Sequence, residues 1–269
     1  MKWNLISWDT DGVFALPDED RMPWYEREDL WDKMGRVMFG EQRMEMAVAE
    51  VDNLIQLLEI STEDSILDLC CGIGRHSNEL ARRGFNVTGV DRTRAYLEIA
   101  KGTAKNEALS TEFVHSDMRD FVRENSFDIA LSMFTSFGYF DDDSQQMTVL
   151  DNVFRSLRPA GRFIIETVGK EVLARIFQEA DWSEGDYGIH LERRKPTDDW
   201  GKMQNTWILI EKDGTRHEWN VTHYLYSAVE LKSLLRSAGF AHVKAYGGLD
   251  GTPYDNNSRR LAVIGMKKE

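Results

Sequence analysis

The segment Ile66–Gly74, ILDLCCGIG, constrains the fold of this chain more than any other. The apolar run 65–69 is typical of a buried parallel strand, Gly72 and Gly74 indicate a turn, and residues 75–83 have a helical pattern. Backbone N–H groups at such a turn and at the helix N-terminus that follows can approach a nucleotide-like ligand closely. The segment therefore predicts an α/β fold with a ligand site at the carboxyl end of this strand.

A carboxylate follows at a matching distance. Residues 86–91 are the next strand-like run, which ends in Asp91, 19 residues after Gly72. A carboxylate there can accept hydrogen bonds from both hydroxyls of a ribose. A dinucleotide is disfavoured, because Ser77 stands where the G-x-G-x-x-G spacing needs glycine and Asp68 would repel phosphates. The pattern favours a cationic ligand that carries no phosphate.

Further landmarks make the chain resemble the class I methyltransferases that use S-adenosylmethionine (SAM). They follow the order and spacing of that family between about residues 60 and 170, with Cys70 standing in place of the family's first glycine. They are Asp68–Gly74, Gly89–Asp91, Ser116–Arg119, Phe127–Leu131 and Leu157–Ile164. The run Thr135–Phe140, TSFGYF, resembles a widespread bacterial and archaeal group of small methyltransferases. Residues 132–135 lack the Asn/Asp-Pro-Pro-aromatic tetrad of enzymes that methylate nucleobase amines.

The resemblance implies a Rossmann-like α/β fold, with a seven-stranded, mainly parallel sheet in a methyltransferase domain over residues 41–269. The alternation of strand and helix patterns agrees with it. We expect strands at 65–70, 86–91, 111–115, 127–133, 161–167, 240–246 and 261–266. We expect helices at 41–58, 75–83, 93–105 and 144–157, and one from the capping residue Ser227 to Gly239.

Two regions depart from this alternation. Residues 1–40 are rich in aromatic residues and predict an irregular N-terminal arm, which either packs on the domain or closes over the ligand as a lid. Residues 180–226 predict an antiparallel insertion with strands at 190–194, 203–211 and 215–224 and a hairpin turn at Asp213-Gly214. By analogy with the family the insertion lies over the substrate site, and the alternative is a flap that only extends the sheet.

Composition narrows the classes of function. The 269 residues carry a net charge of −13, whereas nucleic-acid binders carry a basic face, so nucleic acid is disfavoured as a partner. We expect a cytoplasmic protein without a membrane partner, because no apolar run reaches ~20 residues and no signal peptide is recognisable. The adjacent Cys70 and Cys71 suit neither a disulfide nor a metal site. The chain could be a monomer or a homodimer.

The resemblance implies SAM contacts at the strand ends. The turn at 70–74 would lie near the amino acid and the sugar, Asp91 would bind the ribose, and Arg92 would flank the adenine. Asp117 would accept from the adenine amino group beside Met118, or cap a helix over 118–122. The full set expected to bind SAM is Asp68, Cys70, Gly72, Gly74, Asp91, Arg92, Asp117, Met118, Met133, Trp31 and Arg43, the last toward a carboxylate.

Methyl transfer from a sulfonium is an in-line displacement, so the protein mainly aligns donor and acceptor. A base is needed only where the acceptor must lose a proton. The candidates are Tyr139, Glu166, His223 and Tyr224, each with a structural role as the alternative. The leading hypothesis is methylation of a small molecule, with S-adenosylhomocysteine (SAH) as product. The alternatives are methylation of RNA or protein, a non-catalytic SAM-binding regulatory subunit, and a nicotinamide oxidoreductase, which Ser77 and Asp68 disfavour.

Overall fold

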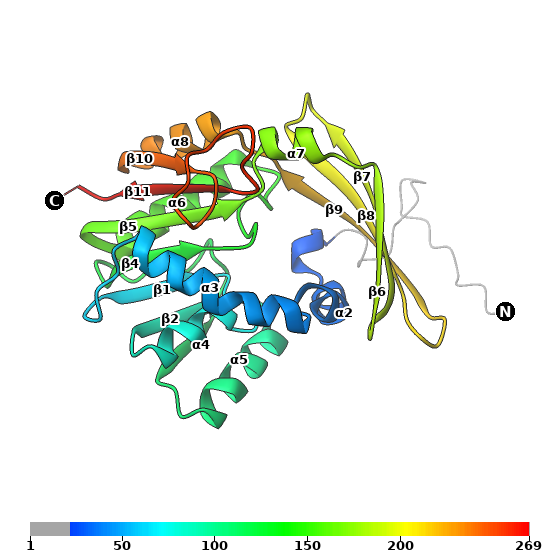
Figure 1. Cartoon of the computed structure of the whole chain (residues 1–269), viewed down its shortest axis with the longest axis horizontal. Coiled ribbons are helices and arrows are strands. Elements are labelled where there is room, and N and C mark those ends of the chain that lie inside the picture. Colours follow the sequence, from blue (N-terminus) through cyan, green and yellow to red (C-terminus); the bar gives the residue numbers. More distant parts are fainter. Residues whose placement is uncertain (1–21, 269) are drawn as a thin grey trace, which may run out of the picture.

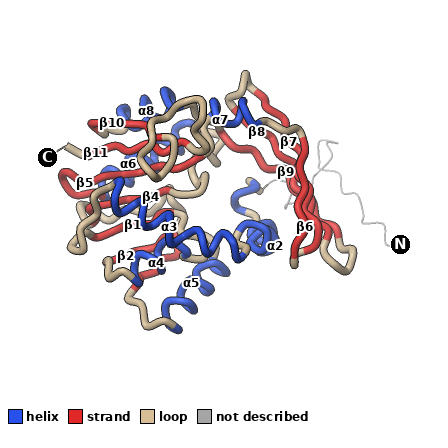
Figure 2. Tube along the Cα trace, in the orientation of Figure 1, coloured by secondary structure: helices blue, strands red, loops and turns tan. Residues whose placement is uncertain are grey.

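The computed structural model describes residues 22–268. Its main sheet consists of β1 (Ser65–Leu69), β2 (Asn86–Asp91), β3 (Thr111–His115), β4 (Phe127–Ser132), β5 (Leu157–Thr167), β10 (Ala241–Tyr246) and β11 (Leu261–Met266). The helices that accompany it are α3 (Glu41–Leu57), α4 (Arg75–Arg82), α5 (Arg94–Asn106), α6 (Asp143–Ser156), α7 (Lys170–Ile176) and α8 (Ala228–Ser237) (Figure 2). The capping box of Ser227 and Glu230 begins α8, as predicted.

The strand order is β10-β11-β5-β4-β1-β2-β3. The five strands β3, β2, β1, β4 and β5 are parallel to one another, and β11 runs antiparallel to both β5 and β10 (Figure 1). This is the predicted Rossmann-like, mainly parallel sheet of the class I methyltransferases, which is thereby confirmed. The carboxyl ends of its parallel strands meet at one edge, where such sheets bind their ligands.

The central strands β1 and β4 are apolar because both of their faces are covered. Leu67 and Ala130 belong to a hydrophobic cluster on one face, and Ile66 and Ile129 to a cluster on the other, all with 0% exposure. Continuous apolar runs of this kind are typical of buried parallel strands. The packing on both faces holds the strand ends, and the side chains that follow them, in fixed positions.

A second sheet, antiparallel and four-stranded, consists of β6 (Ala180–Gly185), β7 (Gly188–Thr197), β8 (Lys202–Ile210) and β9 (Arg216–Tyr224) in that order. The predicted hairpin joins β8 to β9, with Gly214 at a φ of 87°. The sequence did not reveal β6, because nearly all of its side chains are exposed and no apolar alternation marks it. This sheet stands apart from the main one, on the side of its carboxyl edge (Figure 1).

The prediction of an irregular arm over residues 1–40 is wrong for the part that the structure describes. Residues 24–26 form a 3-10 turn, η1 (Trp24–Glu26), and α2 (Glu28–Met38) is a regular helix. Leu30 and Met34, one turn apart, are buried and pack in one cluster with Trp219 and Val221 of β9. Burial of this face against the second sheet stabilises the helix. Residues 1–21, with Trp3, Trp8 and Phe14, lie outside the described residues.

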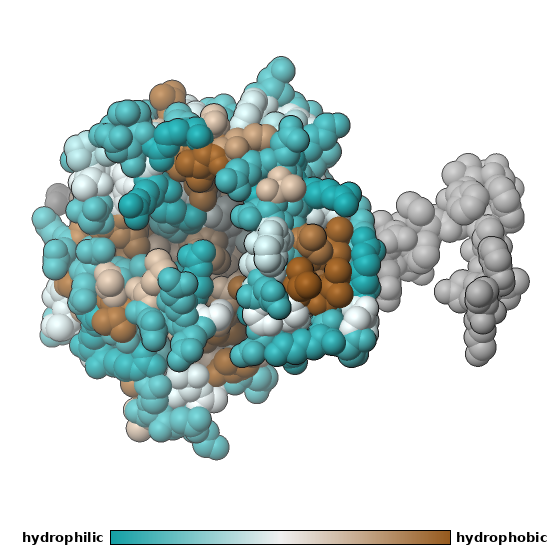
Figure 3. Space-filling model, turned by 45° about the vertical axis from the view of Figure 1, so that its right-hand side comes forward, coloured by the Kyte–Doolittle hydropathy of each residue, from teal (hydrophilic) through white to brown (hydrophobic). Residues whose placement is uncertain are grey.

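The surface is largely hydrophilic, and hydrophobic side chains gather in a few patches on it (Figure 3). Trp182 of β6 is 64% exposed and Ile189 of β7 is 37% exposed. Within residues 22–268, no helix is long and apolar enough to cross a membrane.

Candidate active site

A cavity of about 490 Å³ lies between the carboxyl edge of the main sheet, α2 and the second sheet. Its size suits a small-molecule site, since such pockets measure roughly 300–1,000 Å³. We call one part of its wall the cofactor edge, formed by residues 68–72, 91–93 and 116–118. We call the opposite part the roof chamber, formed by Trp31, Tyr139, His190, Glu192, Trp207 and His223.

Asp91 is the best-defined polar group of the cofactor edge. Its two carboxylate oxygens accept one backbone hydrogen bond each, at 2.8 Å, from Gly72 and from Thr93. Burial raises the pKa of Asp91, against the effect of these two bonds. Each oxygen keeps the capacity to accept a further hydrogen bond. The carboxylate is therefore held in place and can still accept from two hydroxyls.

The turn between β1 and α4 depends on left-handed backbone. Cys70, Gly72 and Gly74 have φ values of 62°, 57° and 76°. This conformation costs a non-glycine residue such as Cys70 about 1–2 kcal/mol. A Cβ atom on Gly74 would lie 2.8 Å from the Cβ of Ala100 in α5. Gly74 thus allows close packing of the turn and does not line the cavity, unlike Cys70 and Gly72.

Asp68 lies just behind this turn and is 2% exposed. The Ser77 hydroxyl donates to its Oδ2 atom at 2.5 Å. Burial raises the pKa of Asp68, and the nearby charges of His76 and Arg75 oppose that shift. Ser77, which breaks the dinucleotide spacing, therefore has a local role in holding this carboxylate.

Asp117 and Arg92 lie at the far end of the cofactor edge, beside the buried Met118. Arg119 pairs with both oxygens of Asp117, at 2.9 and 2.8 Å. Burial raises the pKa of Asp117, but the Arg119 hydrogen bonds lower it overall. No helix begins here, and the Asp117 side chain accepts from the Arg119 backbone N–H instead. The buried Nε of Arg92 has no hydrogen-bond partner in residues 22–268, and it forms an ion pair with Asp117 Oδ2 at 3.6 Å.

The cavity is positively charged where three guanidinium groups surround one ring. Arg43, Arg75 and Arg260 lie 4.5, 5.4 and 5.9 Å from the centre of Phe134. Glu50 pairs with Arg75, and Glu166 pairs with Arg260. No carboxylate of the described chain pairs with Arg43, and burial together with the charges of Arg75 and Arg260 lowers its pKa. An anionic group of a ligand would offset this repulsion.

Two of the four candidates for a base are engaged outside the cavity. Both oxygens of Glu166 contact Arg260, and one also accepts from the backbone of Phe134 at 2.8 Å. The Tyr224 hydroxyl donates to the carbonyl of Asp141 at 2.5 Å. Neither side chain lines the cavity, whereas Tyr139 and His223 do.

His223 and Tyr139 face one another in the roof chamber, with ring centroids 5.2 Å apart. Burial lowers the pKa of His223 to about 4, so its imidazole is neutral at pH 7. No hydrogen bond joins this imidazole to another residue of the described range 22–268. Burial raises the pKa of Tyr139, and the charges of Cys70 and Asp91 raise it further. Tyr139 is therefore a member of the roof chamber that is within electrostatic reach of Asp91 on the cofactor edge.

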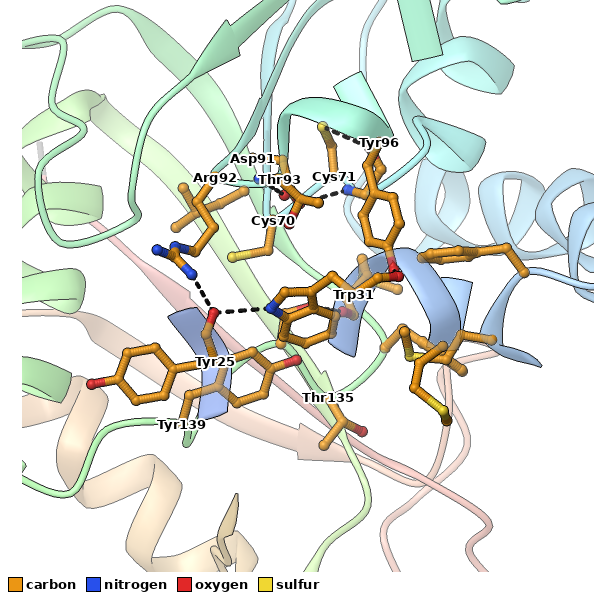
Figure 4. A pocket seen from close by; sticks show the side chains of 18 of the residues that line it. Tyr25, Trp31, Cys70, Cys71, Asp91, Arg92, Thr93, Tyr96, Thr135 and Tyr139 are labelled. Carbon is orange, nitrogen blue, oxygen red and sulfur yellow. Dashed lines mark hydrogen bonds between the residues drawn. The ribbon is translucent and has the colours of Figure 1, made fainter. Parts of the chain in front are cut away.

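Residues 24–38 cover the cavity where the cofactor edge meets the roof chamber. The Tyr25 carbonyl accepts from Arg92 and, at 2.9 Å, from the Trp31 indole, and the Tyr96 hydroxyl donates to the Trp31 carbonyl (Figure 4). On the other side, the Trp24 indole donates to the Thr222 carbonyl at 3.0 Å. This segment is thus bonded to the cofactor edge and to the second sheet at once.

The structure brings together most of the predicted cofactor residues. Those that line the cavity are Trp31, Arg43, Asp68, Cys70, Gly72, Asp91, Arg92, Asp117, Met118 and Met133. The sequence reasoning did not single out His190, Glu192 and Trp207 in the roof chamber. Strand alternation in β7 gives a signal for the first two, because residues two apart share a face.

The chain is similar to known methyltransferases in sequence and in fold. The family model described as "Methyltransferase domain" matches residues 66–161. The cypemycin N-terminal methyltransferase of a Streptomyces species is 24% identical over 204 residues, 74% of this chain and 82% of that protein. The CcbJ methyltransferase of Streptomyces caelestis superposes with a TM-score of 0.74 at 16% identity, over 93% of this chain and all of that one.

SAM-bound CalS10 of Micromonospora echinaspora, an amino pentose methyltransferase, superposes with a TM-score of 0.62 at 16% identity, over 90% of this chain and 96% of that one. These solved structures share the fold of this chain, and the residues matched by the methyltransferase family model include the whole cofactor edge.

Proposed function

We propose that this protein transfers the methyl group of SAM to a small molecule bound in the roof chamber, and that His223 accepts the proton which the acceptor loses. The observation that carries the proposal is that one continuous cavity contains both the cofactor edge and the roof chamber. This cavity joins the cofactor edge to Tyr139 and to a neutral imidazole that has no hydrogen-bond partner in residues 22–268.

The cofactor edge fits SAM in the chemistry of its donors and acceptors. Asp91 would bind the ribose hydroxyls with its remaining lone pairs. The Arg92 guanidinium and the Asp117 carboxylate, which pair at 3.6 Å, would lie along the adenine. Arg43, among like charges, would bind the carboxylate of the methionine moiety, and Asp68 would favour its cationic part. Bound SAM supplies an electrophilic methyl group, whose bond to sulfur breaks as the acceptor heteroatom bonds to the carbon.

The roof chamber would position the acceptor and receive its proton. Because His223 is neutral at pH 7, its lone pair is available for a proton from a heteroatom beside it. The Tyr139 phenol stays protonated, so it can donate a hydrogen bond and does not act as the base. The lining of Trp31, Trp207 and Tyr139 excludes water and limits the orientation of the acceptor.

A small molecule suits this geometry better than RNA does, since the second sheet and residues 24–38 cover the chamber and the net charge is −13. The CalS10 structure, an amino pentose methyltransferase, is compatible with this acceptor class. The cypemycin N-terminal methyltransferase supports a second candidate, the amino group of a peptide. A regulatory subunit without chemistry remains the third reading.

Label transfer from methyl-labelled SAM tests the proposal, with a cell extract divided into small-molecule, RNA and protein fractions. We expect label in the small-molecule fraction. His223→Phe should lower the rate about 100-fold or more with unchanged affinity for SAH. The matched control is Tyr224→Phe, which alters the neighbouring residue outside the cavity and should keep the rate. Label in RNA or protein, or failure to bind SAH, would overturn the proposal. A His223→Phe variant of full activity would remove only the assignment of the base.

A further inference from the structure

The roof chamber contains a second unpartnered imidazole, that of His190. This residue is 9% exposed and lines the cavity, and its buried Nε2 atom has no hydrogen-bond partner within residues 22–268. A buried polar atom without a partner costs free energy unless a ligand satisfies it. The position of His190 on the cavity wall makes the acceptor the natural source of that bond.

His223, Trp207 and His190 form a row across the inner face of the second sheet. Trp207 of β8 lies between them, with ring centroids 6.3 Å from His223 and 6.4 Å from His190. The strand register places His223 opposite Met203 and His190 opposite Leu209, on either side of Trp207 along β8. A molecule that lies on the indole ring can therefore reach both imidazoles with its two ends.

The polar atoms of this row select the chemistry of the far end. A neutral imidazole donates from one nitrogen and accepts at the other, and a hydroxyl group can satisfy either. Burial lowers the pKa of His190, so its imidazole is uncharged at pH 7 and offers no charge to an anion. The carboxylate of Glu192, two residues along β7, accepts from the Trp207 indole at 2.9 Å. Its other oxygen pairs with Arg194, so the described part of the chamber has no unpaired cation here to bind a carboxylate or phosphate on the ligand.

We propose that the methyl acceptor is a ring-shaped, non-anionic molecule with its reactive heteroatom beside His223 and a hydroxyl group bound by the His190 imidazole. The inference rests on the proposed function, because it takes the roof chamber as the acceptor site. It assigns His190 as a specificity-determining residue, which acts on acceptor binding and leaves SAM binding and the proton transfer unchanged.

The first test titrates label transfer with the small-molecule fraction of a cell extract as the acceptor pool. His190→Phe keeps the ring and removes the hydrogen bond, so the pool concentration for half-maximal rate should rise about tenfold. The maximal rate and the affinity for SAH should stay unchanged. His190→Gln places an amide near the former Nε2 and should restore part of the loss. The control is Ile189→Ala, the neighbouring position on β7, which is 37% exposed.

The second test uses matched competitors of label transfer by wild type and by His190→Phe. We expect trans-4-aminocyclohexanol to inhibit wild type about tenfold better than cyclohexylamine, or hydroquinone about tenfold better than phenol. The difference should disappear in His190→Phe. If transfer proceeds while half-saturation is unchanged in His190→Phe and neither pair is distinguished, the inference on His190 is wrong and the proposed function stands. If no small molecule is labelled by wild type, the proposed function itself fails.

Discussion

The cofactor edge and the roof chamber are built in different ways. The cofactor edge comes from one stretch of the chain, residues 68–118, and its central contacts stay within that stretch, such as the bonds of Asp91 to Gly72 and Thr93. The roof chamber is assembled across the chain, as when the Trp24 indole bonds to Thr222 or Trp219 bonds to Asp29. The first part is fixed by the main sheet, and the second by the packing of α2 against the second sheet. We expect substitutions in one part to affect a different binding step from substitutions in the other.

The largest effect expected on the cofactor side is that of Asp91→Ala. Two hydrogen bonds to a charged acceptor, each worth about 1.5–3 kcal/mol, should be lost, so the affinity for SAH should fall at least about 100-fold in calorimetry. The matched control, Asp120→Ala, removes the same charge from an exposed position and should bind SAH normally. Circular dichroism checks that the variant keeps its overall secondary structure after the Gly72 N–H loses its acceptor. SAH binding within about threefold of wild type would show that the ribose lies elsewhere.

The roof chamber has its own signature in the pH dependence of stability. The pKa of His223 is about 4 in the folded protein, below the unfolded value near 6.5. Between these values the unfolded chain binds a proton that the folded protein does not. The free energy of unfolding should therefore decrease as the pH is lowered through this window, by at most about 1.4 kcal/mol per pH unit.

Urea unfolding of wild type and His223→Phe at pH 7, 6 and 5 measures this term as a difference between the two proteins. The carboxylates and His190, whose pKa is also lowered, titrate in both proteins, so their contribution cancels in the difference. The slope with pH should be smaller for the variant. Equal slopes would mean that His223 is solvated, and the chamber open, in solution.

The cofactor edge could be predicted from the sequence and most of the roof chamber could not, because only the first lies within one stretch of the chain. The β1 run, the glycine turn and Asp91 lie within one short stretch of sequence. Their spacing is therefore enough to predict where the strands end and where the carboxylate lies. Helix α2 was missed, because its apolar positions Leu30 and Met34 gain meaning only against β9, about 190 residues away. The position of Glu166 at a strand end suggested a base, but the structure pairs it with Arg260. That pairing is not visible in the sequence, because it depends on β11, which follows Arg260, lying beside β5.

The smallest effect expected lies between α2 and the second sheet. Lys33 of α2 pairs with Glu211 at 2.9 Å, and both side chains are partly exposed. Such pairs contribute about 0–1 kcal/mol, so Lys33→Ala should lower the Tm by no more than about 2–4 °C, and by less at high salt. The control is Lys101→Ala, which breaks a pair with Glu98 inside α5, remote from the roof.

Lys33→Ala sharpens the comparison because its two readouts belong to the two parts. Loosening α2 should raise the half-saturating acceptor concentration modestly and leave SAH affinity as in wild type, since residues 68–118 keep their contacts. A tenfold loss of SAH affinity would show that the bonds from Tyr25 and Trp31 to Arg92 and Tyr96 transmit the position of α2 to the cofactor edge. The two parts would then act as one unit, and closing of residues 24–38 would be linked to cofactor binding by the same free energy in both directions.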